Sequence, residues 1–417
     1  MKVLYHHRTR GADVEAVHIR GVVDGLRGLG HEVQLVAPPG VHLAEADVPT
    51  AKLVPTAPAA RTAAPTANAA PTAPRPKRVS PWSVLSRRAP EAVFEAAELG
   101  YNAWALPSLL AHLGGCDFIY ERYALFLVAG VVAARQRRLP LILEVNDSAV
   151  VSRIRPLGWQ AAARRVERFV WQRADAVITV TGYFRDLIIE AGVDPGRVLV
   201  MPNAVDAAKF AVLPDGAEVR AQYDLRNQVT IGYVGAINFW RRVDLLVRAF
   251  AEVAARRPET QLVLVGDGPD VDGVRQLASS LGIAARVTIT GAVPHAQIPA
   301  YLAALDIAVI PHSNIYGSPM KLFEYMAAGK VVVAPWLPPI ATIVDEASAR
   351  LVPPLDQAAL ASALDALVGD EALRRRLGTR ARELALSQHV WRHHAEQIAE
   401  LGARLRQGPA GATPSLG

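Results

Sequence analysis

The sequence lacks the features that tie a chain together covalently or anchor it in a bilayer. It has one cysteine in 417 residues, Cys116, which excludes an intramolecular disulfide and a cysteine-rich metal site. The longest apolar runs, such as 123–134, are shorter than the roughly 20 residues that a membrane-spanning helix needs. The N-terminus runs directly into a predicted strand and has no signal-peptide layout. We therefore expect a cytoplasmic protein, either soluble or peripheral at the inner face of a membrane.

Aromatic residues and charge are also modest. Aromatic side chains make up 6% of the chain and charged side chains 20%, with a formal net charge of +6 at pH 7. This balance permits an anionic ligand or a weak contact with an anionic membrane surface, and it does not choose between them. A nucleic-acid partner is not expected. The hydrophobic content of 51% allows a large core, and the length allows two or three domains.

Apolar runs of strand length alternate with helical patterns along most of the chain. This alternation predicts an α/β protein with doubly wound parallel sheets. The pattern starts at 2–5 and restarts at 229–236, so we expect two Rossmann-like domains. The expected divisions are a first domain at 1–202, a linker at 203–227, a second domain at 228–387, a final helix at 388–406 and a flexible tail at 407–417.

One stretch of the first domain does not fit this pattern. Residues 44–81 are dominated by Ala, Pro and Thr and lack periodicity, which predicts a disordered insertion. Basic residues follow it around Trp82, and a helical region is expected at 90–113. Together they could touch an anionic membrane surface. A solvated linker beside an ordinary packed helix is the alternative, and we favour it.

The stretch 311–335, PHSNIYGSPMKLFEYMAAGKVVVAP, is the most informative. It reads as a strand end, a loop, a short helix and another strand. Ser318 suits the N-cap of that helix, Pro319 its first position and Gly329 its C-cap. A helix N-terminus at the carboxyl end of a parallel strand presents unpaired N–H groups and a partial positive charge. The sequence therefore predicts a phosphate site there.

Glu324 lies on the predicted helix face that also carries Met320 and Lys321. A carboxylate behind a phosphate site is suited to the hydroxyls of a ribose. The simpler alternative is a glutamate that faces water on a capped surface helix.

Further candidates follow other strands. Gly235 ends the first strand of the second half and lets backbone approach a ligand. Arg241 and Arg242 come next, and a guanidinium can bind diphosphate oxygens with two hydrogen bonds. Cations oppose the dipole at a helix start, which favours an anionic ligand over a solvated arginine pair. Gly266 opens the turn GDGPD, which by itself is a weak signal.

Asn146 and Asp147 end a strand of the first half, LPLILEVND. At the carboxyl end of a parallel strand they would reach the mouth of a cleft between domains. The alternative is an Asx-turn or a helix cap.

The string GSPMKLFEYMAAGKVVVAP resembles the signature of the retaining glycosyltransferases of family 4, which have the GT-B fold. The strings HEVQLVAP, PNAVDAAKF, VGDGP and TGAVPH extend this resemblance over nearly the whole chain. It implies two Rossmann-like domains that face each other across a cleft. It also implies that the C-terminal helix crosses back to the first domain.

The resemblance also implies roles for individual residues. Glu324 matches the glutamate that holds the ribose of the nucleotide, and Arg241 falls on a basic position near the diphosphate. Arg241 and Lys321 are expected to stabilise the leaving diphosphate, and Asn146 and Asp147 to contact the donor sugar. The remaining expected donor-binding positions are Gly235, Arg242, Gly266, Val293 in the loop that reads the base, and the amides of Gly317, Ser318 and Leu322. Gly11 is expected to approach the substrates.

Two departures from the family pattern stand out. The first glutamate of the signature falls on Tyr316, which we place at the sugar instead, and an expected arginine is Ala236. Some branches of the family share the Gly-Ser-Pro loop with a lysine and lack that glutamate. Selection of the sugar would then depend on the loop backbone, Lys321 and the Asn146–Asp147 edge.

The activity that the resemblance implies is transfer of a sugar from a nucleotide-diphosphate sugar to an acceptor hydroxyl, with retention and without a metal or other cofactor. The setting would be biosynthesis of a cell-surface polysaccharide, a glycolipid or a glycosylated metabolite. A catalytically silent scaffold that binds a nucleotide sugar and a sugar phosphorylase of the same fold are the alternatives. The nucleotide base, the sugar and the acceptor are not determined by the sequence.

Overall fold

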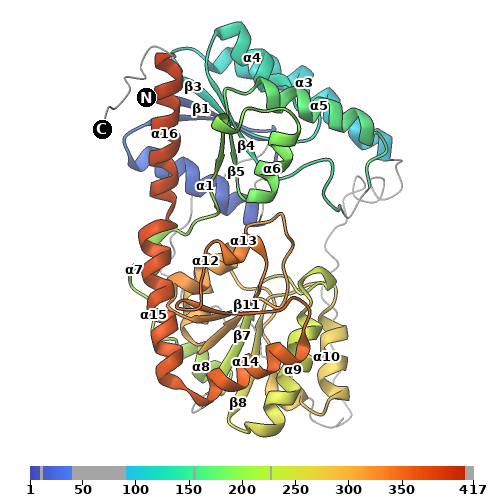
Figure 1. Cartoon of the computed structure of the whole chain (residues 1–417), viewed down its shortest axis with the longest axis vertical. Helices are drawn as coiled ribbons and strands as arrows, with labels where there is room; N and C mark the ends of the chain where they lie inside the picture. The colour runs from blue at the N-terminus through green and yellow to red at the C-terminus, as the bar shows by residue number, and fades with distance from the viewer. Residues whose placement is uncertain (10–12, 40–90, 154–155, 226–227, 409–417) are drawn as a thin grey trace, which may run out of the picture.

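Two parallel sheets, each covered by helices, are stacked along the long axis of the molecule (Figure 1). The computed structural model describes residues 1–9, 13–39, 91–153, 156–225 and 228–408. Gly11, the insertion expected at 44–81 and residues 409–417 of the expected tail lie outside the described residues. The α/β class and the two doubly wound parallel sheets expected from the sequence are confirmed.

The first sheet has six parallel strands in the order β2-β1-β3-β4-β5-β6. Its strands are β1 (Lys2–His6), β2 (Glu32–Val36), β3 (Phe118–Arg122), β4 (Leu141–Val145), β5 (Ala176–Thr179) and β6 (Val198–Val200). The helices are α1 (Asp13–Gly28), α3 (Glu91–His112), α4 (Ala129–Arg137), α5 (Gln160–Arg173) and α6 (Gly182–Glu190).

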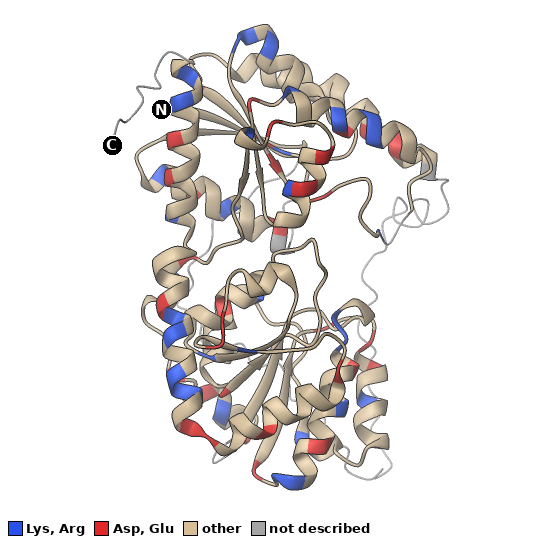
Figure 2. Ribbon diagram, viewed as in Figure 1, with Lys and Arg blue, Asp and Glu red and all other residues tan. Residues whose placement is uncertain are grey.

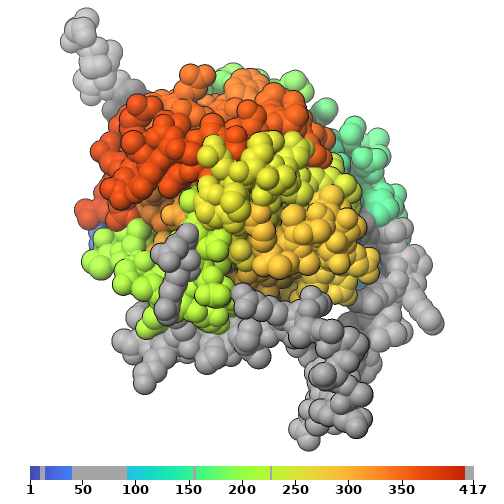
Figure 3. Space-filling model, turned by 90° about the horizontal axis from the view of Figure 1, so that it is seen from below, coloured from blue at the N-terminus to red at the C-terminus, as the bar shows by residue number. Residues whose placement is uncertain are grey.

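The second sheet also has six parallel strands, in the order β12-β11-β10-β7-β8-β9. They are β7 (Val229–Val234), β8 (Thr260–Val265), β9 (Val287–Ile289), β10 (Ile307–Val309), β11 (Val331–Pro335) and β12 (Ala349–Val352). The helices are α9 (Val243–Arg256), α10 (Val271–Ser280), α11 (Ile298–Ala303), α12 (Met320–Ala327), α13 (Pro338–Ala341), α14 (Gln357–Gly369) and α15 (Glu371–Gln388). Seen from below, the segment that carries α9 lies beside the C-terminal segment that carries α14 (Figure 3).

Side chains alternate between the two faces of each sheet, as buried parallel strands require. In β1, Val3 and Tyr5 join a core with α1, whereas Leu4 joins a core with α3 to α6 on the other face. In β10, Ala308 packs towards α12 and α15, and Ile307 and Val309 pack towards α9 and α14. Loops at the carboxyl ends of the strands are therefore held on a rigid frame.

Two segments cross between the domains and pair with each other. Short helices α7 (Ala207–Ala211) and α8 (Ala217–Gln222) follow the first crossing, and α16 (Trp391–Gln407) follows the second. The Val205 amide donates to the His389 carbonyl at 2.9 Å, and the Trp391 amide donates to the Val205 carbonyl at 3.2 Å. This paired crossing places α16 back on the first domain (Figure 1).

A close contact between α1 and α16 secures this return. Trp391, Ala395 and Ile398 of α16 share a core with Ile19 of α1. The α1 backbone can approach the Trp391 ring because Gly21 has no side chain: a Cβ at position 21 would collide with the indole.

Candidate active site

The start of α12 lies at the carboxyl edge of the second sheet, directly after β10. The helix begins at Met320, and Pro319 occupies the N-cap without a side-chain cap. The predicted cap is wrong, because the Ser318 hydroxyl instead accepts the backbone N–H of Asn203 at 3.0 Å. The Met320 and Lys321 amides have no carbonyl one turn earlier within the helix. This end therefore offers hydrogen-bond donors and a partial positive charge.

Positive side chains gather at this helix end. The Lys321 ammonium lies 4.0 Å from the centre of the Tyr233 ring. Burial and the nearby Arg241 charge lower the pKa of Lys321 well below its usual value, and Glu324 opposes that shift. Burial, with Arg242 and Arg241, also lowers the pKa of His312. Such crowding of like charges is relieved when an anion binds.

The two arginines that the sequence placed here differ in their surroundings. Arg242 has a left-handed backbone with φ of 50° and pairs with Asp244 through contacts of 3.0 and 3.1 Å. Within the described part of the chain, Arg241 has no ion pair. Arg241 is therefore the cation with its charge available to a ligand.

Two glycines form the floor beside Lys321. Gly235 and Gly266 have φ values of 141° and 145°, which side chains rarely allow. A Cβ at position 235 would lie 2.7 Å from the Lys321 Nζ, and one at 266 would collide with the Gly235 carbonyl oxygen. Both positions thus keep the backbone close to the cation cluster.

Glu324 does not face open water. Its side chain is 12% exposed, and one carboxylate oxygen lies 2.9 Å from Nε2 of His295. His295 follows the loop that contains Val293, which is half-buried against the second-domain core. The predicted base-reading loop and the predicted ribose ligand are therefore adjacent. Sequence reasoning had not assigned His295 a role.

The predicted amides at this turn are not all available. The Gly317 amide donates to the Asn314 side chain at 2.5 Å. Leu322 is fully buried, and its amide donates to the Pro319 carbonyl at 3.0 Å. The amides of Met320 and Lys321 are the better candidates for an anion.

Across the interface, a buried carboxylate organises the edge of the first sheet. Glu144, at the end of β4, accepts hydrogen bonds from Arg122 at 2.5 Å, Tyr120 at 2.7 Å and Asn146 at 2.8 Å. His18 of α1 lies 3.0 Å from the same carboxylate. Burial alone would raise the pKa of Glu144, but His18 and Arg122 hold it well below its usual value.

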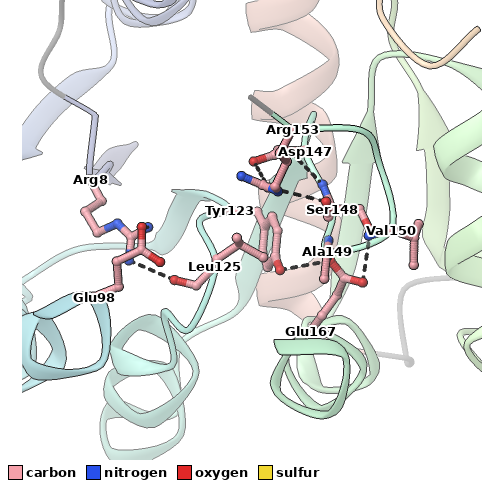
Figure 4. Close-up of polar contacts among 10 residues, drawn as sticks. All are labelled: Arg8, Glu98, Tyr123, Leu125, Asp147, Ser148, Ala149, Val150, Arg153 and Glu167. Carbon is pink, nitrogen blue, oxygen red and sulfur yellow. Dashed lines mark hydrogen bonds and ion pairs between the residues drawn. The ribbon is translucent and has the colours of Figure 1, made fainter. Parts of the chain in front are cut away.

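The adjacent residues Asn146 and Asp147 point to different places. Asn146 donates to Glu144 and lines the cavity between the domains. Asp147 instead pairs with Arg153 (Figure 4). The loop that carries both is anchored by Glu167 of α5, which accepts the Ala149 amide at 2.9 Å. Asp147 therefore lies in a loop-stabilising ion pair, and Asn146 is the better placed of the two for a ligand.

A cavity of about 170 Å³ lies between the two domains. It joins the polar edge of the first sheet to the start of α12. Its lining residues are Glu15, His18, Arg122, Asn146, Val180, Asn203, Gly317, Ser318 and Met320. Hydrogen-bonding groups from both domains thus converge on one space.

Tyr316 lies beside this cavity as an interdomain contact. Its ring lies 6.0 Å from that of Tyr183 and 6.1 Å from that of Phe184, centre to centre, both on α6. Its carbonyl oxygen accepts the Thr181 hydroxyl at 3.0 Å. Tyr316 is therefore placed to hold the domains together at the edge of the site.

Sequence reasoning missed the groups that the first domain contributes. Arg122 and Glu144 are register partners at the ends of adjacent strands, and the strings ERY and EVN contain that signal. His18 and Asn203 gave no comparable local signal, because α1 and the crossing segment meet only in the folded chain.

Comparisons with known proteins agree with this architecture. The family described as glycosyl transferases group 1 matches residues 217–384, and the glycosyl transferase 4-like domain matches residues 15–204. A D-inositol 3-phosphate glycosyltransferase of Nocardia farcinica is 30% identical over 347 residues, or 77% of this chain and 74% of the relative. A GDP-mannose-dependent alpha-(1-6)-phosphatidylinositol monomannoside mannosyltransferase of Mycolicibacterium smegmatis is 29% identical, over 60% of this chain and 68% of the relative.

Solved structures share the fold at lower sequence identity. Anabaena HepE in complex with UDP covers 97% of this chain and 100% of its own, with a TM-score of 0.69 and 19% identity. Sucrose-phosphate synthase of Thermosynechococcus elongatus has a TM-score of 0.65 and 20% identity, over 97% of this chain and 98% of its own.

Proposed function

The chain belongs to the group 1 glycosyltransferases and is a glycosyltransferase, and from this premise we propose that it transfers a sugar from a nucleotide-diphosphate sugar with retention. The acceptor is a hydroxyl group in a cell-surface polysaccharide, a glycolipid or a glycosylated metabolite. Relatives named for inositol 3-phosphate and phosphatidylinositol monomannoside acceptors support that range.

The observation that carries the proposal is the cation cluster at the uncapped start of α12. Lys321 and Arg241 lie beside the first helix amides, which have no side-chain cap within the described part of the chain, and Glu324 lies one turn further along. A diphosphate complements the cations, and a ribose offers hydroxyl donors to the carboxylate. HepE is described with UDP and UDP-glucose, and the mycobacterial relative as GDP-mannose-dependent, which supports a nucleotide sugar and leaves the base open.

In this proposal the chain's own groups meet the charge that develops during transfer. As the bond between sugar and diphosphate breaks, negative charge grows on the departing oxygen. Lys321, Arg241 and the first α12 amides stabilise that charge without a metal ion. Asn146 and the interdomain cavity hold the sugar and the acceptor hydroxyl close to the anomeric carbon.

A thermal-shift panel of UDP-, GDP-, ADP- and dTDP-sugars tests the proposal. A ligand that binds only the native protein raises its melting temperature. At least one donor is expected to do so, and Glu324→Ala is expected to remove the shift. Arg376→Ala, an exposed change on α15, is the control that keeps it. If no donor stabilises the wild-type protein at about millimolar levels, the proposal fails.

We also propose that the protein meets an anionic membrane surface from the cytoplasmic side through α5. Figure 2 shows basic positions along this helix, and its four arginines are exposed: Arg164, Arg165, Arg168 and Arg173. Trp159 and Phe169 are each 39% exposed beside them. Basic and aromatic side chains together suit a lipid headgroup layer. No helix in the described chain is long and apolar enough to cross a bilayer.

A further inference from the structure

His18 is a buried histidine with a polar partner at each ring nitrogen. It lies on α1 and is 6% exposed. Its Nδ1 is 2.8 Å from Oδ1 of Asn203, and its Nε2 is 3.0 Å from Oε1 of Glu144. The ring therefore connects the buried carboxylate of the first domain to the segment that crosses to the second.

The partners of His18 can only accept hydrogen bonds. The Asn203 amide nitrogen donates to the Ser318 carbonyl at 2.6 Å, and a carbonyl has no proton to offer in return. The Asn203 oxygen must therefore face His18. Glu144 accepts hydrogen bonds from the Arg122 guanidinium, the Tyr120 hydroxyl and the Asn146 amide nitrogen, so it is an ionised carboxylate that can only accept. Both ring nitrogens of His18 must then carry protons, so the partners define an imidazolium cation.

The chain of contacts continues to the start of α12. Besides its side-chain bond, Asn203 donates its backbone N–H to the Ser318 hydroxyl at 3.0 Å. Ser318 immediately precedes Pro319, the N-cap of α12. Asn203 thus fixes the loop that presents the first helix amides, and His18 fixes the orientation of Asn203.

We propose that His18, as an imidazolium, is a positioning residue that holds the start of α12 in its anion-binding geometry through Asn203 and Ser318. The inference rests on the proposed function, because the anion is the diphosphate of the donor. A neutral His18 ring carries only one N–H proton. Its other ring nitrogen would then face an acceptor oxygen of Asn203 or Glu144 without a hydrogen bond. Loss of the proton therefore loosens one end of the chain of contacts.

The surroundings of His18 leave it as the charged ring of this cluster. Arg122 of β3, Glu144 of β4 and Glu15 of its own helix line the same region. From α16, the Trp391 ring lies 4.8 Å away centre to centre. Burial, and after it the charge of His18, lower the pKa of the neighbouring His394 to about 3, so His394 is neutral at neutral pH.

The state of the ring is tested directly by 15N NMR of the full chain labelled at histidine, with His18 assigned by its loss in His18→Gln. The expected spectrum has protons on both ring nitrogens at neutral pH. A neutral tautomer would overturn the inference, whatever ligand the protein binds.

The positioning role is tested by calorimetric titration with UDP and GDP across pH. The dissociation constant of His18→Gln should exceed that of the wild type about tenfold in mildly acidic buffer, because a hydrogen bond to a charged group is lost. The ratio should fall towards one at any pH at which the NMR spectrum shows that the wild-type ring has lost a proton. Any effect of Lys321 is common to both proteins and cancels in this ratio. A ratio that does not change with pH contradicts the inference.

Asn203→Ala provides a second variant that leaves His18 intact. It should weaken UDP or GDP binding about as much as His18→Gln, and the double variant should be no weaker than either, because all three break one chain of contacts. Additive losses contradict the inference. His112→Gln, an exposed ring on α3 bonded within its own helix, is the control that should bind like the wild type. If the NMR spectrum shows a charged ring but the wild type binds neither UDP nor GDP, the proposed function fails. The claim that His18 positions α12 for donor binding then fails as well. The contact of His18 with Asn203 is unaffected by that result.

Discussion

Arg241 and Arg242 are neighbours in sequence and differ in how much charge they offer to a ligand. Arg242 already pairs with Asp244, whereas Arg241 lies among cations at the start of α12. Arg241→Ala should therefore weaken binding of a nucleotide diphosphate about tenfold or more, a typical effect for a lost charged hydrogen bond. Arg242→Ala should cost clearly less, and isothermal titration of the two variants compares them. Equal losses of affinity in the two variants would contradict the idea that pairing with Asp244 makes Arg242 less available to the ligand.

Lys321 is expected to lower the stability of the fold while it contributes to donor binding. Its folded-state pKa is lowered by burial and by Arg241 from a usual value of 10.5. Between the lowered value and about 10.5 the unfolded chain holds more protons, so stability rises with pH in that window. Lys321→Met removes the buried charge and should raise the melting temperature most in mildly acidic buffer.

The gain from Lys321→Met should stop shrinking above about pH 10.5, where lysine is neutral in both states, while donor binding is lost at every pH. Thermal unfolding of wild type and variant across pH measures the difference. A variant that is less stable than the wild type throughout would show that the Tyr233 contact outweighs the buried charge.

Individual site residues could be predicted from the sequence where their signal is local. Glu324, Lys321 and Arg241 lie within short motifs, and the structure brings the last two together at α12. His18, Arg122, Glu144 and Asn203 converge from four separate segments, so no single window contains them. The residue type of Ser318 predicts a helix cap. Its hydroxyl instead accepts a hydrogen bond from Asn203, which lies 115 residues away in the sequence, so no local pattern could reveal that contact.

The packing of α16 on α1 gives a matched pair of glycine substitutions. A Cβ at Gly21 would collide with the Trp391 ring, whereas Gly28 of the same helix has nothing within 4 Å of that position. Gly21→Ala should destabilise the protein by about 1–3 kcal/mol through overpacking. Gly28→Ala should be neutral or stabilising by up to about 1 kcal/mol, because alanine favours helix. Chemical denaturation compares them, and a similar effect of both changes would contradict the described contact.

The exposed arginines of α5 predict how the protein partitions onto lipid. A double change, Arg165→Glu with Arg168→Glu, should reduce binding to vesicles that contain phosphatidylglycerol at least tenfold, since each basic residue near such a surface contributes about 1 kcal/mol. The control Arg376→Glu, on the second domain, makes the same change of charge at one position and should have little effect on vesicle binding. Vesicle co-sedimentation measures this. Binding that the double change leaves intact would place the membrane contact elsewhere.

Most helices and strands were predicted from periodicity, because their apolar positions repeat at 3.6 or 2 residues. Their starts were less predictable. The sequence pattern predicts a basic helix at 154–173 and another helix at 125–138, whereas α5 begins at Gln160 and α4 begins at Ala129. The amide of Val128, directly before α4, donates to the Asn102 side chain, so a tertiary contact sets where that helix begins.

The arrangement of the two domains explains why the site needs the whole chain. The cation cluster and Glu324 come from the second domain, the buried carboxylate network comes from the first, and Asn203 comes from the crossing between them. Repeated strand–helix units predicted both sheets, and the family resemblance predicted their GT-B arrangement. The interdomain contacts of Tyr316 and Ser318 could not be predicted, because they depend on how two separately folded surfaces meet.

We propose that the start of α12 and Glu324 together bind the nucleotide of a sugar donor. Calorimetric titration of UDP and GDP into the wild type and into Glu324→Gln tests it most directly, since the amide keeps the shape and removes the charge. One of the two nucleotides should bind the wild type, and Glu324→Gln should bind it about tenfold or more weakly. Equal binding by the two proteins would contradict it, as would the absence of binding by the wild type.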